Sequence, residues 1–307
     1  AIGQTPDPDM ALLNFDEFLQ GLPAGVQLFT MIKINPQLMS LLAEIMGMAP
    51  RLAAHLTGRP AVLDSVLTPG FFEPIPPATE LKNELNRIIG HTEYIEDILN
   101  ATRRWAHDRR FQVGVQRLRK LTTSSESAID YSSIAETALE CMFTPVANEF
   151  IAKHGNITGG EMAFIALGKL GSREMTASSD LDLIIIYRAQ KDGTVSNGEK
   201  PLSINQYFAR LSQRQINALT ALTQEGGLFE VDMRLRPLGK SGPIASRYSS
   251  FSTYYKEQAW AWEHMALTRA RVIFATSNIF RLDIEAKIRD ILTIPRDKDK
   301  LLRDVST

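Results

Sequence analysis

The sequence predicts a mostly helical α+β protein, in which a helical N-terminal domain (residues 1–156) precedes a domain that contains a sheet (residues 157–307). Up to about residue 156, short apolar segments with helical periodicity alternate with proline and glycine breaks. From residue 161 onward, continuous apolar runs typical of buried strands alternate with longer helical segments. This alternation indicates helices packed on a sheet.

In the N-terminal domain, proline and glycine separate the expected helices. Longer helices are expected over residues 80–121, with breaks near Gly90 and Gly114, and over residues 131–154. The segment 124–130 between them is expected to be a loop. The shorter helices are expected at residues 14–22, 25–34, 36–47 and 50–56.

In the C-terminal domain, three runs read as strands. MAFIALG ends in glycine, LDLIIIY is rich in β-branched residues, and FEVDMRLRP alternates apolar and polar residues until it stops at Pro237. The expected strands are residues 162–168, 181–187 and 229–237, and the expected helices are residues 203–223, 248–273 and 277–292.

Composition excludes several classes of protein. The apolar fraction of 44% and the charged fraction of 22% are those of an ordinary globular protein. A net charge of −1 gives no basic surplus, so we expect no general nucleic-acid binding. Cys141 is the only cysteine, and the five histidines form no His-Glu-x-x-His pattern, so neither disulfides nor a zinc site is expected.

The sequence gives no sign of a membrane protein. No apolar run approaches the roughly 20 residues that span a bilayer. The N-terminal segment AIGQTPDPDM has neither the basic nor the apolar region of a signal peptide. We therefore expect a cytoplasmic protein. The missing initiator Met and the charged segment 297–307 lead us to expect a piece of a longer chain.

Asp180 and Asp182 lie at the head of the expected strand 181–187. Residues two apart in a strand project from one face of the sheet, about 6–7 Å apart along the chain. Carboxylates this close repel, and a hard divalent cation such as Mg²⁺ relieves the repulsion. An isolated Asp-x-Asp pair is more often two solvated carboxylates at a strand end, and it is the surrounding sequence that favours a metal site here.

A glycine turn precedes this pair. Gly171 and Ser172 follow an expected strand, where free backbone N–H groups and the Ser172 hydroxyl can bind phosphate. A plain tight turn explains the same residues. The spacing of a P-loop is absent here, and also at residues 239–241 (GKS), where Arg234 occupies the position that has to be glycine.

A third polar cluster lies in FEVDMRLRP. Alternation along a strand places Asp232, Arg234 and Arg236 on one face. A solvated sheet face explains the pattern too. If Asp232 pairs beside Asp180 and Asp182, the site gains a third carboxylate, and the arginines offset the charge of the carboxylates and of a triphosphate.

These three clusters, in this order, resemble the DNA polymerase β-like nucleotidyltransferase superfamily, whose members carry a Gly-Ser loop, an Asp-x-Asp pair and a later strand aspartate. Longer segments are similar to the glutamine synthetase adenylyltransferase family: GKLGSREMTASSDLDLI, VDMRLRPLGKSGP, EQAWAWEHMALTRARV and the helical segment 21–56. The resemblance covers most of the chain. It implies a polymerase β-like core with a mixed sheet, in a chain that ends before the family's C-terminal helical domain.

The family is bifunctional and has two homologous halves. One half transfers AMP from ATP to a tyrosine of glutamine synthetase, and the other removes it by phosphorolysis. Residues 257–272, with Ala-Trp-x-Trp-Glu-His, resemble the transferring half, whereas VDMRLRPLGKSGP occurs in the removing half as well. The resemblance thus implies transfer. The alternatives are the removing half and a non-catalytic module that binds glutamine synthetase or a nitrogen-signalling protein.

The resemblance also implies roles for individual residues. Asp180 and Asp182 would hold two Mg²⁺ ions, and Asp232 would complete the metal site on the side of the nucleophile and act as its base. An ordinary surface salt bridge explains each cation among the candidate phosphate ligands equally well. The candidate nucleotide and phosphate ligands are Lys169, Gly171, Ser172, Arg173, Arg234 and Arg236.

The remaining candidates concern recognition and partners. Trp262, Glu263 and His264 are candidates for contacts to the nucleotide or the target, and one of Trp260 and Trp262 is expected in the core because they cannot share one helix face. The resemblance implies glutamine synthetase as a partner and, through the full-length enzyme, the PII signal protein. Neither a nucleic acid nor a membrane is expected.

Overall fold

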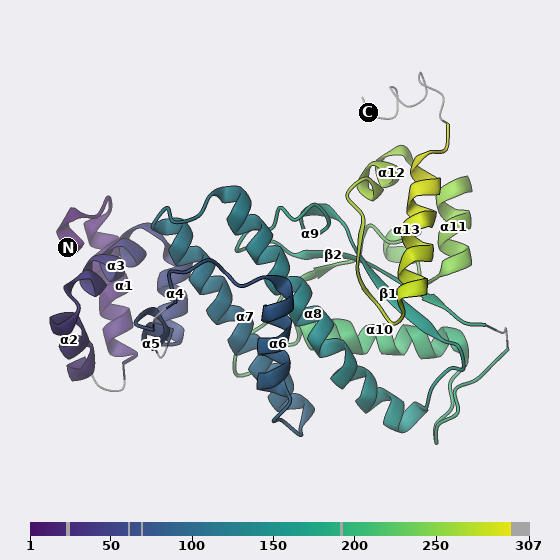
Figure 1. Cartoon of the computed structure of the whole chain (residues 1–307), viewed down its shortest axis with the longest axis horizontal. Coiled ribbons are helices and arrows are strands. Elements are labelled where there is room, and N and C mark those ends of the chain that lie inside the picture. Colours follow the sequence, from purple (N-terminus) through teal and green to yellow (C-terminus); the bar gives the residue numbers. More distant parts are fainter. Residues whose placement is uncertain (23–24, 61, 69, 191–192, 296–307) are drawn as a thin grey trace. The chain divides into compact units, whose positions relative to one another are not determined.

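The computed structural model describes residues 1–22, 25–60, 62–68, 70–190 and 193–295 (Figure 1). The charged segment 297–307 lies outside the described residues. Within them the chain is mainly helical and contains a five-stranded sheet, in agreement with the predicted α+β class. None of the helices in these ranges combines the length and the apolar character needed to cross a membrane.

The chain forms two compact units, and helices α7 (Ile95–Leu118) and α8 (Ser124–His154) contribute to both. The unit that contains the sheet includes part of the segment expected to belong to the N-terminal domain. The boundary at residue 156 between two domains therefore stays a prediction. The first unit comprises Ala1–Pro76 and His107–Tyr131, and the second comprises Pro77–Ala106 and Ser132–Thr307.

In the first unit, short helices pack around an apolar core. Proline occupies the first turn of α1, α3 and α4, where its missing N–H costs no hydrogen bond. Asp7 caps α1 by accepting a hydrogen bond from the Met10 N–H (3.0 Å). Phe18, Leu42 and Ile45 are buried in the core. The helices are α1 (Pro8–Gln20), α2 (Gly25–Ile34), α3 (Pro36–Met48), α4 (Pro50–Gly58) and α5 (Val62–Val66).

Two predictions for the long helices are wrong, and one is confirmed. Helix α6 (Ala78–Ile89) ends before Gly90, as predicted. Helix α7 continues through Gly114, where a β-carbon would lie 2.7 Å from the Leu52 side chain, so glycine allows close packing. Helix α8 begins at Ser124, so the segment 124–130 is helical and the expected loop there is wrong. Thr123 and Glu126 start the helix early because they form a reciprocal capping box, in which the Thr123 N–H donates to Glu126 (2.7 Å).

The sheet is mixed, as the family resemblance implies. Strand β1 is antiparallel to β2 and to β5, whereas β3 and β4 pair with β2 in parallel. The order is β3-β2-β1-β5, with β4 also beside β2. The strands are β1 (Glu161–Ala166), β2 (Leu181–Arg188), β3 (Val231–Asp232), β4 (Ser246–Arg247) and β5 (Arg271–Ala275).

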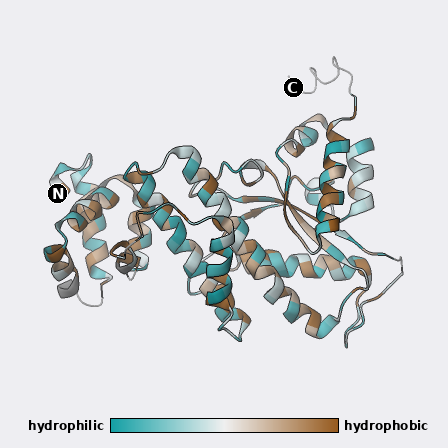
Figure 2. Ribbon diagram, viewed as in Figure 1, coloured by the Kyte–Doolittle hydropathy of each residue, from teal (hydrophilic) through white to brown (hydrophobic). Residues whose placement is uncertain are grey.

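Helices cover both faces of this sheet (Figure 1). Ile165 and Ile184 belong to a core with helices α11 (Tyr248–Glu257), α12 (Ala261–Leu267) and α13 (Asn278–Leu292). On the other face, the ring of Phe143 of α8 packs against that of Phe164, with 5.9 Å between the ring centroids. The ring of Phe208 of α10 (Ile204–Thr220) stacks on that of Tyr187, with 4.4 Å between the centroids. The central strands are accordingly apolar (Figure 2), and this packing makes them a rigid base for residues at their ends.

Two predictions in this unit need correction. The expected strand 229–237 is limited to Val231–Asp232, because the chain turns at Arg234 and loses its pairing partner. The expected helix 248–273 is wrong as well. It divides into α11, α12 and strand β5, because the run RVIFA at 271–275 pairs with β1.

Arg103 is fully buried in the second unit and binds the C-terminal end of α10. Its Nη2 donates to the carbonyls of Ala218 (2.8 Å) and Ala221 (2.7 Å), and its Nε donates to that of Gly226 (3.1 Å). The last carbonyls of a helix have no partner within the helix, and a cation there is favourable. Arg103 therefore fixes the loop that leads from α10 to β3.

We expect Arg103→Met to lower the free energy of unfolding by about 3 kcal/mol or more, because several buried carbonyls lose a charged donor. Urea denaturation followed by circular dichroism measures this loss. The matched control is Arg104→Met, which removes an exposed ion pair to Glu225 and should cost less than about 1 kcal/mol. Equal losses for the two variants would contradict the anchoring role.

Candidate active site

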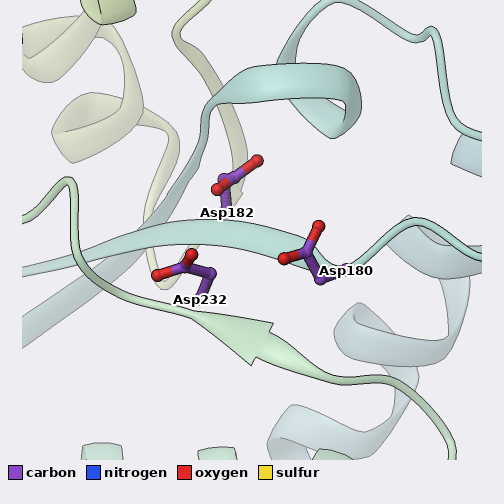
Figure 3. Close-up of side chains that lie close together, drawn as sticks. All are labelled: Asp180, Asp182 and Asp232. Carbon is purple, nitrogen blue, oxygen red and sulfur yellow. The ribbon is translucent and has the colours of Figure 1, made fainter.

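The parallel pairing of β2 with β3 creates a cluster of three carboxylates. Asp182 stands in register with Asp232, and Asp180 lies directly before β2 (Figure 3). One carboxylate oxygen from each residue lies within 4.8 Å of the others. The structure thus brings together the three aspartates that the sequence singled out, which we call the carboxylate trio.

Asp182 and Asp232 respond to this crowding in opposite ways. Burial raises the pKa of Asp182, and the charges of Asp180 and Asp232 raise it further, against smaller opposing effects of Arg234 and Lys169. For Asp232, the hydrogen bond from Arg234 lowers the pKa in spite of partial burial. Asp232 therefore stays ionised at neutral pH, whereas burial and the neighbouring charges disfavour ionisation of Asp182.

Arg234 is the counter-ion of Asp232. Its backbone N–H donates to Oδ1 (2.8 Å) and its Nε to Oδ2 (2.6 Å), with Nη2 in ion-pair contact with the same oxygen. The Arg234 side chain is otherwise exposed, so it can leave this carboxylate with little loss of packing.

Arg236 lies in a different environment, because β3 ends at Asp232. Its guanidinium donates to the carbonyls of Met233 (2.9 Å), Lys240 (3.2 Å) and Gly242 (3.2 Å), which closes the turn after β3. The expected common face with Arg234 is therefore not formed. A phosphate contact by Arg236 stays a prediction that requires it to leave these carbonyls.

The glycine turn α9 (Gly168–Gly171) lies against the trio. Gly168 has a positive φ of 50°, and a β-carbon there would lie 2.0 Å from Asp182 Oδ2. The Leu167 N–H donates to the carbonyl oxygen of Asp182 (2.9 Å). Sequence reasoning missed Gly168. Its signal was the first glycine of ALGKLGS, directly after a strand, where a backbone comes close to another group.

The predicted phosphate ligands in this turn are already engaged in hydrogen bonds to nearby residues of the same segment. The Gly171 N–H donates to the carbonyl of Leu167 (2.8 Å), and the Ser172 N–H to that of Gly168 (3.2 Å). The Ser172 hydroxyl donates to the same carbonyl (3.0 Å) and contacts Glu174 Oε2 (2.8 Å). Phosphate binding by Gly171 and Ser172 stays a prediction, and for Ser172 it requires the hydroxyl to turn away from these acceptors.

The two cations of the turn point to different places. Lys169 is exposed, and its charge is close enough to Asp182 to lower the pKa of that carboxyl. Arg173 has a positive φ of 58°, and its Nη2 lies 3.9 Å from Glu136 of α8. Lys169 is thus better placed than Arg173 to meet the charge of a ligand at the trio.

The segment around α12 differs from its prediction. Trp260 and Trp262 are 68% and 52% exposed, so the expectation that one of them lies in the core is wrong. Trp260 precedes α12, and its backbone N–H donates to the carboxylate of the buried Glu263 (2.9 Å). The same carboxylate accepts a hydrogen bond from the Tyr254 hydroxyl (2.7 Å). His264 is buried edge-on to a tyrosine of α11. The contacts of Glu263 and His264 are structural, and recognition by them stays a prediction.

The trio fits a divalent cation. Carboxylates are the preferred ligands of Mg²⁺, and a cation between Asp180, Asp182 and Asp232 offsets both the burial and the like charges that raise the pKa of Asp182. Within the described ranges, no other group of three acidic, histidine or cysteine side chains lies close enough together to hold a metal ion.

A mixed sheet with three clustered carboxylates, on or directly before two adjacent strands and beside a glycine turn, is the core of a nucleotidyltransferase-like protein. The chain belongs to the glutamate-ammonia ligase adenylyltransferase family, whose model matches residues 39–284. This result confirms the resemblance found in the sequence.

Curated relatives cover nearly the whole chain. It is 44% identical over 305 residues to the bifunctional glutamine synthetase adenylyltransferase/adenylyl-removing enzyme of Brucella melitensis. The enzymes of the same name in Bartonella henselae and Agrobacterium fabrum are 42% and 43% identical over 305 residues. Each alignment covers 99% of this chain but 31% of the relative, so the chain spans about a third of these proteins.

We expect Asp182→Asn to stabilise the metal-free protein at pH 7. The pKa of Asp182 is raised in the folded state, so ionised Asp182 costs stability as pH rises from about 3.9, its unfolded pKa, through the higher folded value. The gain should vanish below about pH 4, where the carboxyl is protonated in both states. Urea denaturation in EDTA at both pH values measures it.

Asp232→Asn is the matched control and should have the opposite sign. The pKa of the Asp232 carboxyl is lowered in the folded state, so ionised Asp232 stabilises the fold at neutral pH, and the asparagine variant should lose stability there. Excess Mg²⁺ should stabilise only the protein with all three carboxylates. Changes of the same sign in both variants in EDTA would contradict this account of the trio.

We expect Gly168→Ala to weaken metal binding by roughly 10-fold or more, because the new methyl group displaces Asp182 Oδ2. Titration calorimetry with Mn²⁺ measures the affinity. Gly193→Ala is the control for backbone strain, since Gly193 also has a positive φ (77°) but a β-carbon there meets nothing within 4 Å. Similar Mn²⁺ affinities for both variants would refute the contact.

Proposed function

We propose that this chain is the adenylyl-transferring half of a bifunctional enzyme, which moves AMP from ATP to a tyrosine of glutamine synthetase and releases pyrophosphate. The carboxylate trio on β2 and β3 is the observation that carries the proposal. Relatives 42–44% identical to the chain are named for this activity and for its reversal. The Ala-Trp-x-Trp-Glu-His segment of residues 259–264 favours transfer.

In the proposed reaction, the tyrosine oxygen attacks the α-phosphorus of ATP, and the bond to pyrophosphate breaks. Asp180, Asp182 and Asp232 would hold two Mg²⁺ ions. Bound cations of this kind supply positive charge to the entering and leaving oxygens. A tyrosine hydroxyl has a pKa near 10 and is a poor nucleophile at neutral pH, so the site needs a base.

Asp232 is the proposed base, and Arg234 limits it. The contact that keeps Asp232 ionised also lowers its pKa, which makes it a weaker base. We propose that Arg234 moves from Asp232 to the phosphates of ATP when the substrates bind. This movement would raise the basicity of Asp232 and place positive charge on the nucleotide, with Lys169 and Ser172 meeting the charge of pyrophosphate.

The removing half of the same enzyme is the second candidate. The motif at residues 231–243 also has the form found in that half. There an oxygen of inorganic phosphate would attack the phosphorus of the tyrosine-bound AMP at the same carboxylates, which forms ADP and releases the tyrosine hydroxyl. A non-catalytic binding module is disfavoured, because all three carboxylates are present and lie together. Interaction with the PII protein stays a prediction for the full-length enzyme.

Labelled ATP distinguishes these candidates. With α-labelled ATP, Mg²⁺ and unmodified glutamine synthetase, we expect the synthetase to become labelled. If the chain instead releases label from modified synthetase only when phosphate is added, it is the removing half. If neither reaction occurs even at high enzyme concentration, the result favours the non-catalytic binding module.

Substitutions in the trio test the assignment of the site. We expect Asp180→Asn and Asp182→Asn to reduce AMP transfer at least about 100-fold, since charge at the reacting phosphate is lost, while the circular dichroism spectrum is unchanged. Asp290→Asn, an exposed aspartate of α13, is the control and should retain activity within a few-fold. Activity of the trio variants near that of the control would refute the assignment.

A further inference from the structure

We propose that Arg271 and Glu136 are positioning residues that hold the glycine turn α9 against the carboxylate trio. The inference rests on the proposed function only in taking the trio as a metal site. Neither residue touches the trio in the contacts described above, and both act through the backbone of the turn.

Arg271, the first residue of β5, binds the C-terminal end of α9. Its Nε donates to the carbonyl of Gly171 (3.1 Å), and its Nη2 donates to that of Leu170 (2.9 Å). Carbonyls at the end of a helix lack partners within the helix, and a guanidinium satisfies them favourably. The turn is thus tied to the strand that carries Arg271.

Glu136 of α8 fixes the guanidinium from the other side. Its Oε2 accepts from Arg271 Nη1 (2.9 Å) and its Oε1 accepts from Nη2, so the pair is bidentate. The side chains of Arg271 and Glu136 are 27% and 19% exposed, which limits screening by water. A bidentate pair sets orientation as well as charge, and lysine cannot reproduce it.

The turn transmits this position to the trio because it is short and tightly packed at both ends. At Gly171, a β-carbon would lie 2.1 Å from the carbonyl oxygen of Arg269, so the turn lies directly against the chain before β5. At Gly168, three residues earlier, the backbone meets Asp182 Oδ2. A shift of the turn at the Arg271 end therefore moves the residues that confine the Asp182 carboxylate.

A matched pair lies at the other end of the sheet, because Arg271 pairs with Ala166 at one end of β1 and Arg188 pairs with Glu161 at the other. Arg188 of β2 binds Glu161 of β1, with the two residues in register and with side chains 31% and 21% exposed. Arg188 also pairs with Asp283 of α13 and contacts no part of α9 in the described bonds. Loss of this pair should therefore cost stability similar to loss of Arg271–Glu136, without an effect on the trio.

The test is Mn²⁺ affinity measured by titration calorimetry on the whole chain. We expect Arg271→Lys and Glu136→Gln to weaken Mn²⁺ binding about 10-fold, as is usual when groups that orient metal ligands are lost. Arg188→Lys and Glu161→Gln should bind Mn²⁺ as the unsubstituted chain does. Thermal unfolding monitors the stability of all four variants, and the conservative changes keep it comparable.

Two results would overturn the inference. One is Mn²⁺ affinity unchanged in Arg271→Lys. The other is equal weakening in the Arg188 and Arg271 variants, which would mean a general effect of stability. If the chain binds Mn²⁺ through the trio but transfers no AMP, only the proposed function fails. If the unsubstituted chain does not bind Mn²⁺, both the metal site and the positioning role are refuted.

Discussion

Repulsion among three carboxylates is the constraint on which the rest of this structure depends. The parallel register of β2 and β3 places Asp182 beside Asp232, and Asp180, two residues before Asp182, joins them. Burial and like charge raise the pKa of Asp182, so ionisation of this group costs the fold stability. Such a cost persists only where surrounding elements leave the side chains no alternative position.

The surroundings differ for the members of the trio. Asp182 lies on a strand whose neighbours are packed on both faces by helices, which leaves its backbone little freedom. Asp232 lies instead on a two-residue strand at the sheet edge. Its position depends on the Leu181 N–H, which donates to the carbonyl of Glu230 (2.9 Å), and on Arg103, which fixes the preceding loop. The third carboxylate is therefore held by contacts distant in sequence.

This difference explains how much of the site could be predicted from the sequence. Asp180 and Asp182 were predicted to lie together because alternation within one strand is local information. The extent of the strand at Asp232 was not predictable from alternation, because the pattern of FEVDMRLRP continues past the point where β2 offers a partner. Arg271 and Glu136, separated by 135 residues, belong to no local pattern at all.

The errors in the fold have similar causes. The start of α8 was missed although Thr123 and Glu126 carry a local capping signal. The segment of strand β5 was predicted to be helical because a short apolar run fits a helix or a strand. Its pairing with β1, which the sequence does not reveal, makes it a strand. The tryptophans were misjudged for a related reason. The prediction assumed that both lie on one long helix, where residues two apart face different directions. Trp260 in fact lies before the short helix α12, so both tryptophans can be exposed.

The carboxylate trio does not determine the direction of the proposed reaction. Transfer to tyrosine and phosphorolytic removal both displace an oxygen at the same phosphorus, so charge that stabilises one displacement stabilises the other. Direction must then depend on which nucleophile reaches the phosphorus, and this is decided by surfaces around the trio. The segment that favours transfer forms the start of α12, where buried Glu263 holds the Trp260 backbone and both tryptophans are exposed. Selectivity between the halves is therefore to be sought outside the carboxylates, in residues that meet the incoming partner.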